Sequence, residues 1–312
     1  MKPLVSVILI AYNHESYIEE AIKSIVTQNT DFNFELIVGE DRSTDGTLSI
    51  VKEYQAKWSH IIQVITSNKN VGITDNLLRC LKAAKGKYIA FCEGDDYWCS
   101  NSKLQKQVDF LEQNPEFGLV HSDVNHLDDK TGRLTKAYNS LNEIKIPSGF
   151  VFEFLMKPSH SVKTMTVCFR KTLLDQFYLS NNEIMSSDWK LIDISMWLML
   201  AQKTKFFYFN EALATYRLLP ESTSRSKNPR KLYEFHQKIF NIRFYFLRKY
   251  ITIEENRLLL FKSYYRSLIS DGYNLKNLKI LNHGKKGLQR MNVRLTIKQR
   301  LFEKLCLLKN LL

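Results

Sequence analysis

Long apolar runs are missing from this sequence of 312 residues, and none approaches the roughly 18 to 20 residues that cross a bilayer. The apolar run at residues 4–11 is short and has no small-residue cleavage site, so it predicts a buried strand better than a signal peptide. We expect neither a membrane-spanning helix nor a secretory leader.

Cysteine is scarce. The chain has five, with no Cys-x-x-Cys pair: Cys80, Cys92, Cys99, Cys168 and Cys306. This odd number argues against a disulfide framework, and the spacing is not that of a zinc site. Free thiols are typical of a reducing compartment, so we expect a cytoplasmic protein.

Glycine-rich phosphate loops are also lacking. Neither Gly-x-Gly-x-x-Gly nor a Walker loop follows the first apolar run, which disfavours the usual dinucleotide and P-loop nucleotide sites. With eleven Gly and six Pro against 44% hydrophobic residues, the composition is that of a globular protein rather than a collagen-like or disordered one.

Negative charge is sparse towards the C-terminus. Residues 231–312 hold 18 Lys and Arg against five acidic residues, whereas residues 1–230 hold 27 of each sign. The formal net charge of +13 therefore lies entirely in the last segment. This asymmetry predicts a main domain at residues 1–230 and a basic helical extension at residues 231–312.

The basic extension interleaves its charges with apolar residues at helical spacing, as at Phe240, Phe244 and Leu247. Two interpretations stay open: helices that pack on the main domain with solvated basic faces, and helices that lie on an anionic membrane surface. Nucleic acid is disfavoured, because no recognition motif accompanies the charge.

Strand and helix signals alternate through the first third of the chain. Apolar runs predict strands at residues 4–11, 34–38, 61–65 and 87–92. Amphipathic stretches between them predict helices. This βαβαβ alternation indicates an α/β fold with a mostly parallel, Rossmann-like central sheet flanked by helices.

Beyond residue 115 the regular alternation of strand and helix signals ends. Strands at residues 117–124, 164–169 and 206–216 are expected in an antiparallel-leaning extension, with an apolar helix at 193–202. From residue 231 onward the pattern predicts only helices.

The carboxyl ends of the predicted strands hold the candidate site, because ligands of open parallel sheets bind there. Glu93, Asp95 and Asp96 follow the fourth strand, and such close carboxylates repel one another unless a cation or protons intervene. Hard oxygen ligands suit Mg²⁺ or Mn²⁺, bound through one or two carboxylates and substrate phosphates. A solvated acidic turn is the alternative.

Two further residues follow the first two strands. Tyr12 offers an aromatic face on which a base can stack, and Asp41 offers an acceptor for a ring N–H. Taken alone, Asp41 is weak evidence, because a carboxylate there could simply cap the next helix, although Asp45 is better placed for that role.

Four strings together resemble the family 2 glycosyltransferases of the GT-A fold, in both order and spacing. They are VSVILIAYN at residues 5–13, EDRSTDGT at 40–47, AKGKYIA at 84–90 and EGDDYW at 93–98. The resemblance covers about residues 4–225, and the last string is similar to bacterial enzymes that build surface glycans. It implies a GT-A catalytic domain followed by a C-terminal helical extension.

The resemblance implies roles for the donor side. Tyr12 and the backbone near Ala11 would contact the nucleotide base, and Asp41 would accept a hydrogen bond from the base imide. Asp95 would lie near the ribose and the sugar of the donor.

The resemblance also implies a metal site and an acceptor side. Asp96, the last residue of a D-x-D-like motif, would bind Mn²⁺ or Mg²⁺ on the donor diphosphate. Glu93 stands where that motif often has its first Asp, and Trp98 would line the acceptor side.

The family's general base is a carboxylate just ahead of an apolar helix, in a pattern such as Asp-x-x-x-Trp-Leu. Asp193 fits this spacing with Trp197 and Leu198, which makes it the predicted base. Asp188, followed by Trp189, is the runner-up, and a role for Asp193 as a mere helix cap stays open.

Two departures from the family pattern weaken further assignments. Asp75 stands before Asn76, where relatives often have an Arg that touches the nucleotide. Leu218 stands where the following loop often holds a His, so a His metal ligand is not expected. Arg217 and the stretch 222–225 are candidates to close over the diphosphate instead.

The implied activity is an inverting sugar transfer from a nucleotide sugar, with UDP the commoner base, to a glycan or a polyprenyl-diphosphate-linked acceptor. Capsule, lipopolysaccharide or O-antigen biosynthesis is the implied role, with the protein peripheral on the inner face of the membrane through residues 231–312. A non-catalytic scaffold with a degenerate transferase domain and a basic partner-binding tail is the alternative. A nucleotidyltransferase is disfavoured, because no triphosphate loop is present.

Overall fold

The computed structural model describes residues 2–160, 162–190, 193–220, 222, 225–250 and 252–309, the side chains of 307–309 excepted. The chain divides into two compact units, Met1–Phe152 with Ser161–Leu218 and Glu153–His160 with Leu219–Leu312. The predicted domains 1–230 and 231–312 stay a prediction.

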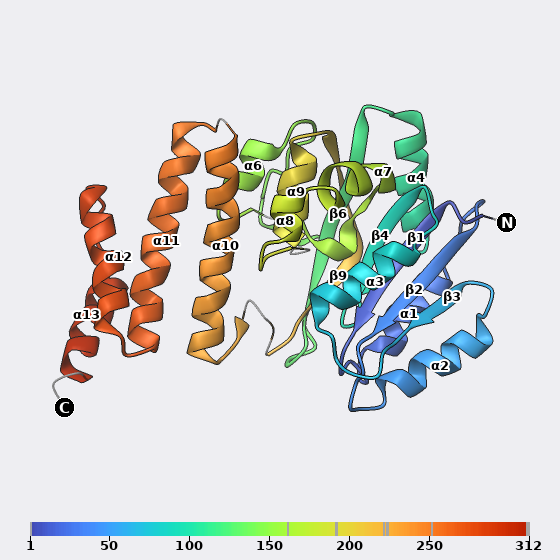
Figure 1. The fold of residues 1–312 in the computed structure, drawn as a ribbon, viewed down its shortest axis with the longest axis horizontal. Coiled ribbons are helices and arrows are strands. Elements are labelled where there is room, and N and C mark those ends of the chain that lie inside the picture. The colour runs from blue at the N-terminus through green and yellow to red at the C-terminus, as the bar shows by residue number, and fades with distance from the viewer. Residues whose placement is uncertain are drawn as a thin grey trace. The chain divides into compact units, whose positions relative to one another are not determined.

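The first unit is built on a mixed sheet flanked by helices (Figure 1). Its parallel part contains, in spatial order, β3 (Ile62–Ile65), β2 (Phe34–Glu40), β1 (Val5–Ala11) and β4 (Tyr88–Glu93). β1 is almost wholly buried, as expected of a central parallel strand with both faces covered. The four strands predicted in the first third are confirmed, with small shifts at their ends.

Three amphipathic helices connect these strands: α1 (Ile18–Val26), α2 (Thr47–Lys57) and α3 (Ile73–Ala83). α1 buries Ile18, Ile22 and Ile25, which share one helical face. At the start of α2 the Asp45 carboxylate accepts the N–H of Thr47 at 3.0 Å, which satisfies one of the unpaired donors of that helix end.

The sheet continues beyond β4 through β8 (Cys168–Arg170), β6 (Phe117–Asp128), β9 (Lys205–Leu218) and β5 (Tyr97–Trp98), with β7 (Leu134–Thr135) paired to β6. β8 is antiparallel to β4 and β6, and β5 is antiparallel to β9, as the expected extension requires. β6 and β9, however, are parallel.

The strand predicted at residues 164–169 is wrong in its first half. A 3₁₀ turn, η1 (Thr164–Thr166), precedes β8. The reason is local: both the N–H and the hydroxyl of Thr166 donate to the carbonyl of Lys163, at 3.0 and 2.6 Å, which closes a turn where a strand would stay extended.

The remaining helical segments of this unit are α4 (Lys103–Gln113), α5 (Tyr138–Leu141), α7 (Lys171–Leu173), the π-helical η2 (Leu174–Leu179), α8 (Asn182–Met185) and α9 (Asp193–Ala201). α9 buries every residue after its first, which confirms the predicted apolar helix. Its Trp197 packs edge-on against Phe91 of β4 and Phe169 of β8.

The second unit is helical. It contains most of α6 (Phe152–Met156) together with α10 (Pro229–Lys249), α11 (Glu254–Asn274), α12 (Leu278–Arg290) and α13 (Ile297–Lys309), so the helices predicted from residue 231 are confirmed. Asn228 caps the start of α10, with Pro229 at its first position. Phe240 of α10 stacks on Tyr264 of α11, with ring centroids 3.8 Å apart.

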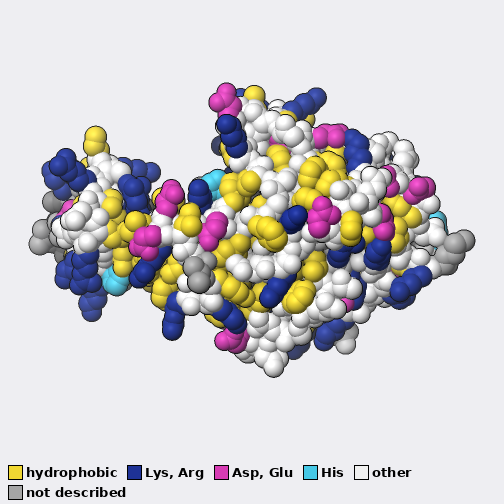
Figure 2. All heavy atoms as spheres, turned by 90° about the horizontal axis from the view of Figure 1, so that it is seen from above, with side chains coloured by type: hydrophobic (Ala, Val, Ile, Leu, Met, Phe, Trp, Pro, Cys, Tyr) yellow, Lys and Arg dark blue, Asp and Glu magenta, His cyan; other side chains and the backbone are white. Residues whose placement is uncertain are grey.

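Basic and apolar side chains share the surface of the last two helices. Figure 2 shows Lys and Arg side chains gathered over α12 and α13. On α13, Ile297 and Leu301 are 88% and 52% exposed and lie one turn apart, beside the exposed Lys298, Arg300 and Lys304. Within the described ranges, no helix combines the length and apolar character needed to cross a membrane.

Lys103 is fully buried beneath β5, with its ammonium 4.2 Å from the ring centroid of Trp98 and 2.7 Å from Gln107 Oε1. Burial lowers the pKa of Lys103 from 10.5 to about 8. Between these two values the unfolded chain binds a proton that the folded chain has released. The free energy of unfolding should therefore rise from pH 8 to 10.5, by roughly 3 kcal/mol.

Denaturant unfolding of the wild type and of Lys103→Met, followed from neutral to alkaline pH, checks this prediction. Other groups titrate in the same range, so the relevant quantity is the difference between the two stability curves. We expect the wild type to gain stability relative to Lys103→Met as pH rises. A constant difference would contradict a charged, buried Lys103.

Candidate active site

The carboxyl ends of β1, β2 and β4 meet at one edge of the sheet. Ala11 pairs with Glu40, and Ile10 pairs with Glu93. The N–H of Asp41 bonds to the carbonyl of Ala11 at 3.0 Å, which extends the ladder past the last strand residue. Register alone thus brings Tyr12, Asp41 and the acidic turn at 93–96 together.

The acidic turn packs tightly on the segment after β1. The N–H of Gly94 donates to Ile10 O, and that of Asp96 to Glu93 O, both at 3.1 Å. A Cβ atom on Gly94 would lie 2.6 Å from His14 Nδ1 and 3.1 Å from Ala11 Cβ. A side chain at position 94 would collide with His14 and Ala11. Glycine is therefore required for the turn to approach the segment after β1 this closely.

Three carboxylates are compressed within this turn. Burial and repulsion from Asp95 raise the pKa of Glu93 to about 8. Burial, followed by the charges of Asp95 and Glu93, raises the pKa of Asp96 well above its ordinary value. Glu93 Oε2 is buried and has no hydrogen-bond partner among the described residues. The surroundings of the turn therefore do not by themselves stabilise three ionised carboxylates.

This arrangement fits a hard divalent cation. The donors are carboxylate oxygens, one of them orphaned, and a cation would relieve the repulsion among them. Within the described ranges, no group of three or more His, Cys, Asp or Glu side chains is arranged to hold a metal ion by itself. The residues thus suit a cation that takes one or two carboxylates and completes its shell with substrate oxygens.

Tyr12 directly follows β1 at this edge of the sheet, and its side chain is 44% exposed. Asn13, the next residue, and Arg42, in the loop after β2, adopt left-handed backbone angles, with φ of 56° and 61°. The loops after β1 and β2 are bonded to each other, because Asn13 N–H donates to Ser43 Oγ at 3.0 Å and Asn13 Oδ1 accepts Thr44 N–H at 2.8 Å. Such strained, cross-linked positions are typical of ligand sites.

Asp41 is only 2% exposed. Its two carboxylate oxygens accept the N–H groups of Val71 and Gly72, each at 2.8 Å. Arg79 NH2 lies 3.7 Å from Asp41 Oδ1 and donates to Asn76 Oδ1 at 2.9 Å. A carboxylate has about four lone-pair sites, so Asp41 retains capacity for a further donor. An Arg from the next turn of α3 thus approaches Asp41, although the position before Asn76 holds Asp75.

Asp193 is the first residue of α9 and is partly buried. Its Oδ1 accepts the N–H of Ile194 at 2.6 Å. Besides burial and Asp95, the charge of Asp193 also raises the pKa of Glu93, so the two carboxylates lie within electrostatic reach. Asp188 is exposed. The choice between them as base stays a prediction, and the proximity to Glu93 supports Asp193.

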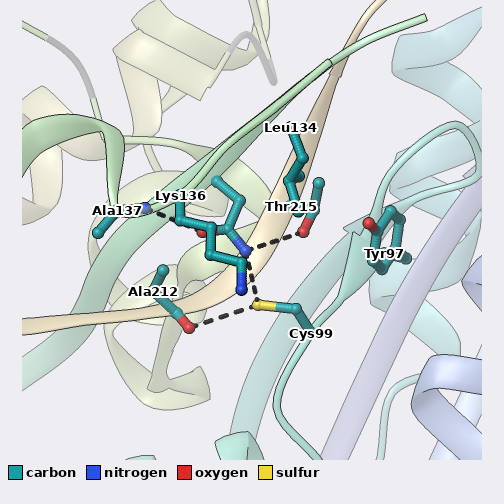
Figure 3. A pocket seen from close by; sticks show the side chains of 8 residues that line it. Tyr97, Cys99, Leu134, Lys136, Ala137, Ala212 and Thr215 are labelled. Carbon is teal, nitrogen blue, oxygen red and sulfur yellow. Dashed lines mark hydrogen bonds between the residues drawn. The ribbon is translucent and has the colours of Figure 1, made fainter. Parts of the chain in front are cut away.

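Trp98 does not occupy the predicted acceptor side. Its side chain is 4% exposed, belongs to the main hydrophobic core and donates its indole N–H to Met165 O at 3.0 Å. Successive residues of a strand point to opposite faces. Tyr97 and Cys99 therefore face the other way, into a cavity of about 420 Å³ that Lys136 also lines (Figure 3).

Arg217 braces the acidic turn from β9. Its backbone N–H donates to Asp96 Oδ1 at 2.7 Å, and its Nε donates to Asp95 O at 3.0 Å. The guanidinium forms ion pairs with Glu20 at 2.5 Å and Asp129 at 3.5 Å. Arg217 thus positions the turn instead of closing over a ligand. Residues 223 and 224 of the predicted closing stretch lie outside the described residues.

Sequence patterns missed three neighbours of the turn. His14 contacts Gly94, and burial lowers its pKa against the opposing fields of Asp95 and Asp45. Thr164 is close enough to lower the pKa of Glu93, and Lys163 is close enough for its charge to lower the pKa of Asp96. His14 lies shortly after the end of the first predicted strand, and that position could have marked it as a candidate. No local sequence pattern marks Lys163 or Thr164.

Comparison with known proteins gives a family match over more than half of the chain. Residues 6–177 match the family described as Glycosyl transferase family 2. The putative teichuronic acid biosynthesis glycosyltransferase TuaG of Bacillus subtilis is 30% identical over 72% of this chain and 83% of that protein. The GalNAc(5)-diNAcBac-PP-undecaprenol beta-1,3-glucosyltransferase of Campylobacter jejuni is 30% identical over 74% of this chain and 71% of that protein.

Other relatives match over a shorter region. Uncharacterized proteins of Mycobacterium bovis and Mycobacterium tuberculosis are 43% identical over 111 residues, 36% of this chain. The match spans about a third of their own length, 32%.

Solved structures share the architecture. Staphylococcus aureus TarS in complex with UDP-GlcNAc has a TM-score of 0.57 at 18% identity and covers 95% of this chain and 93% of its own. The mannosyltransferase PcManGT of Pyrobaculum calidifontis, in complex with GDP-Man and Mn²⁺, has a TM-score of 0.57 at 16% identity. The match covers 100% of this chain and 81% of that one. These likenesses confirm the predicted fold class, a mixed α/β GT-A fold with C-terminal helices.

Proposed function

This chain belongs to glycosyl transferase family 2, and from that membership we propose that it transfers a sugar from a nucleotide-sugar donor to a glycan or lipid-linked acceptor, with inversion at the anomeric carbon. One observation carries the proposal. The acidic turn at 93–96, whose surroundings disfavour the ionised carboxylates, follows the strand next to the one that ends just before the exposed Tyr12, and it lies within electrostatic reach of the predicted base Asp193.

The donor would lie across the strand ends. The Tyr12 ring and the backbone near Ala11 would take the base, and Asp41 would accept the base imide N–H with its remaining lone pairs. Asp95 would contact the ribose and the sugar. UDP is our first choice of nucleotide, because TarS is crystallised with UDP-GlcNAc, although PcManGT holds GDP-Man.

Asp96, assisted by Glu93, would hold Mg²⁺ or Mn²⁺ against the donor diphosphate. A bound cation supplies positive charge that offsets the charge building on the leaving diphosphate. Arg217 keeps one Asp96 oxygen oriented through its backbone N–H, which leaves the other oxygen for the site. The donor set of hard oxygens supports this choice of metal.

Asp193 would act as general base. It accepts the proton of an acceptor hydroxyl while that oxygen attacks the anomeric carbon from the side opposite the diphosphate. Asp193 is the partly buried first residue of a helix whose later residues are all buried, which supports a defined position for its carboxylate. A single displacement of this kind inverts the anomeric configuration.

The relatives support a role in bacterial surface polysaccharide biosynthesis. TuaG is named for teichuronic acid biosynthesis, and the Campylobacter enzyme for a PP-undecaprenol-linked acceptor. A polyprenyl-diphosphate-linked glycan at the cytoplasmic face of the membrane is accordingly our proposed acceptor class.

A donor panel tests the proposed function. UDP-, GDP- and dTDP-sugars are incubated with the protein, with and without EDTA, and nucleoside diphosphate release is measured. We expect release from one nucleotide class, lost on chelation and restored by Mn²⁺. No release, together with no nucleotide binding by calorimetry, would contradict the proposal and favour the non-catalytic scaffold.

We further propose that residues 231–312 bind an anionic membrane surface. The support is the concentration of positive charge in this segment and the exposed pair Ile297 and Leu301 on α13. Apolar side chains flanked by basic ones suit the boundary between acyl chains and anionic headgroups.

Vesicle sedimentation tests the membrane proposal. Each basic residue near an anionic surface contributes about 1 kcal/mol to binding. Replacing Lys298, Arg300 and Lys304 together with Gln should therefore weaken binding to phosphatidylglycerol vesicles about a hundredfold or more. A triple Gln variant of Lys23, Lys52 and Lys57, exposed on α1 and α2, is the charge-matched control and should bind normally.

Binding of the wild type should also weaken with salt and fall on pure phosphatidylcholine, because screening and loss of anionic lipid remove the attraction. Equal binding to both vesicle types, or equal loss in the two triple variants, would contradict the proposal.

A further inference from the structure

The cavity of about 420 Å³ lies on the face of β5 that does not carry Trp98 (Figure 3). The strand register aligns three of its side chains across neighbouring strands, because Tyr97 of β5 pairs with Thr215 of β9, which pairs with Asn125 of β6. A cavity of this size falls within the usual range of small-molecule sites, about 300 to 1,000 Å³. The sheet itself thus forms one wall of a space that can take a small ligand.

The buried Asn125 ties the walls of this cavity together. It is 7% exposed, and its Nδ2 donates to Cys99 Sγ at 3.3 Å and to Thr215 Oγ1 at 3.4 Å. Its Oδ1 accepts the N–H of Ala137 at 3.0 Å, and Cys99 Sγ donates to Ala212 O at 3.4 Å. Dashed lines in Figure 3 mark these bonds. They join β6 and β9 to the segments that follow β5 and β7, so the cavity is largely formed before a ligand binds.

Lys136 gives the cavity a positive charge. Of the described residues that line it, only Lys136 belongs to a charged type, and its side chain is exposed. In the part of the chain that the structure describes, Lys136 has no ion-pair partner. Glu211, whose charge acts on Cys99, is paired with Lys106 at 2.7 Å. The cavity therefore favours an anionic ligand.

Tyr97 connects the cavity to the acidic turn. It directly follows Asp96, the proposed metal ligand. Its ring centroid lies 5.8 Å from the guanidinium carbon of Arg217, whose Nε donates to Asp95 O at 3.0 Å. One side of the cavity thus begins at the turn where the donor is proposed to bind.

We propose that this cavity binds an anionic sugar unit of the acceptor glycan, one that bears a carboxylate or a phosphate. The proposal rests on the proposed function and names the class of its acceptor. The Lys136 ammonium donates a charge-assisted hydrogen bond to the anionic group. The Tyr97 ring offers an apolar surface to the C–H face of the sugar and a hydroxyl to its polar edge.

Labelling of Cys99 tests the proposal, because Cys99 is exposed and the other four cysteines are buried. The rate of its reaction with a maleimide is followed by intact mass with D-glucuronate, D-glucose 6-phosphate, D-glucose or acetate, at equal ionic strength. We expect protection by at least one of the two anionic sugars, less by glucose and none by acetate. The two anionic sugars distinguish a carboxylate from a phosphate. Cys99→Ser should abolish the labelling.

Three lysine variants sharpen the test. Losing a hydrogen bond to a charged group should raise the concentration of anionic sugar that gives half-protection about ten- to a hundredfold in Lys136→Met, with no change for glucose. Lys136→Arg keeps the charge and should retain most of the protection. Lys130→Met, an exposed change in the turn between β6 and β7 and outside the cavity, should behave as the wild type.

Each variant is compared with its own labelling rate without sugar. Burial raises the pKa of Cys99 and the charge of Lys136 opposes this rise, so the basal rate itself changes when Lys136 is replaced. Once the donor is identified, Lys136→Met should raise KM for an anionic acceptor and leave kcat and donor affinity unchanged.

Equal protection by glucose and by the anionic sugars would contradict the role of Lys136, and equal protection by acetate would indicate an anion site that does not recognise a sugar. No protection by any of these compounds, in a protein that releases nucleoside diphosphate in the donor panel, would overturn this inference alone. A protein inactive in the whole donor panel would contradict the proposed function, and a sugar bound in the cavity would then not be an acceptor.

Discussion

Replacing Asp96 with Asn is expected to lower sugar transfer about a thousandfold or more, because in the proposed mechanism its carboxylate holds the cation that would supply several kcal/mol of stabilisation at the leaving diphosphate. The Asn side chain still offers an oxygen to the N–H of Arg217, so the turn should keep its shape. Calorimetry with nucleoside diphosphate should show that Mn²⁺ no longer increases the affinity.

Stability gives a second measurement on the same variant. Because burial and its neighbours raise the pKa of Asp96, the ionised carboxylate destabilises the folded state at neutral pH. Asp96→Asn should therefore unfold at higher temperature than the wild type. Asp109→Asn, an exposed change on α4, is the matched control for both measurements. Near-normal turnover, or a large loss of stability, would contradict the role given to Asp96.

Replacing Asp193 with Asn is expected to lower kcat by about a hundred- to ten-thousandfold, the usual contribution of a general base. Affinity for the nucleoside diphosphate should not change, because in the proposed mechanism this carboxylate acts on the acceptor hydroxyl and not on the nucleotide. Single-turnover measurement with saturating donor isolates this step.

Asp188→Asn is the control that separates the two candidate bases. Asp188 is exposed, so its loss should leave both turnover and stability near the wild type. The reverse result, a loss in Asp188→Asn and normal transfer in Asp193→Asn, would move the base assignment. Equal nucleotide affinity in both variants shows that neither change has damaged the donor side.

Local patterns were sufficient for the parallel part of the fold. β1 is a continuous apolar run because it is covered on both faces, and α1 shows Ile18, Ile22 and Ile25 on one side because only that side is covered. Parallel strands have their carboxyl ends at one edge of the sheet. The strand pattern therefore predicts that Tyr12, Asp41 and the acidic turn lie together.

The acceptor side could not be predicted in the same way. Whether Trp98 or its neighbours Tyr97 and Cys99 face the core depends on which side of β5 is covered, and two strand residues carry no readable alternation. The core lies on the Trp98 side. The Trp98 side chain therefore packs in the core and hydrogen-bonds to the backbone of η1, and it does not form a surface for the acceptor.

Long-range neighbours were also beyond the reach of local patterns. Arg79 approaches Asp41 from a turn of α3 that matches no motif, and Arg217 reaches Asp96 from β9, 121 residues further along the chain. Thr164 lies where a strand was expected and a 3₁₀ turn formed, and Lys163 is the residue directly before that turn.

The amino-acid order by itself determined the parallel sheet, the acidic turn at its edge, the buried helix that begins with Asp193 and the basic helical segment at the end. Each of these follows from the period of apolar residues or from charge counted along the chain, and such properties are local. The tertiary structure alone decided which cation meets the turn, which face of β5 is buried and which carboxylate comes near Glu93. These depend on strand order and pairing, which join residues that no sequence period relates.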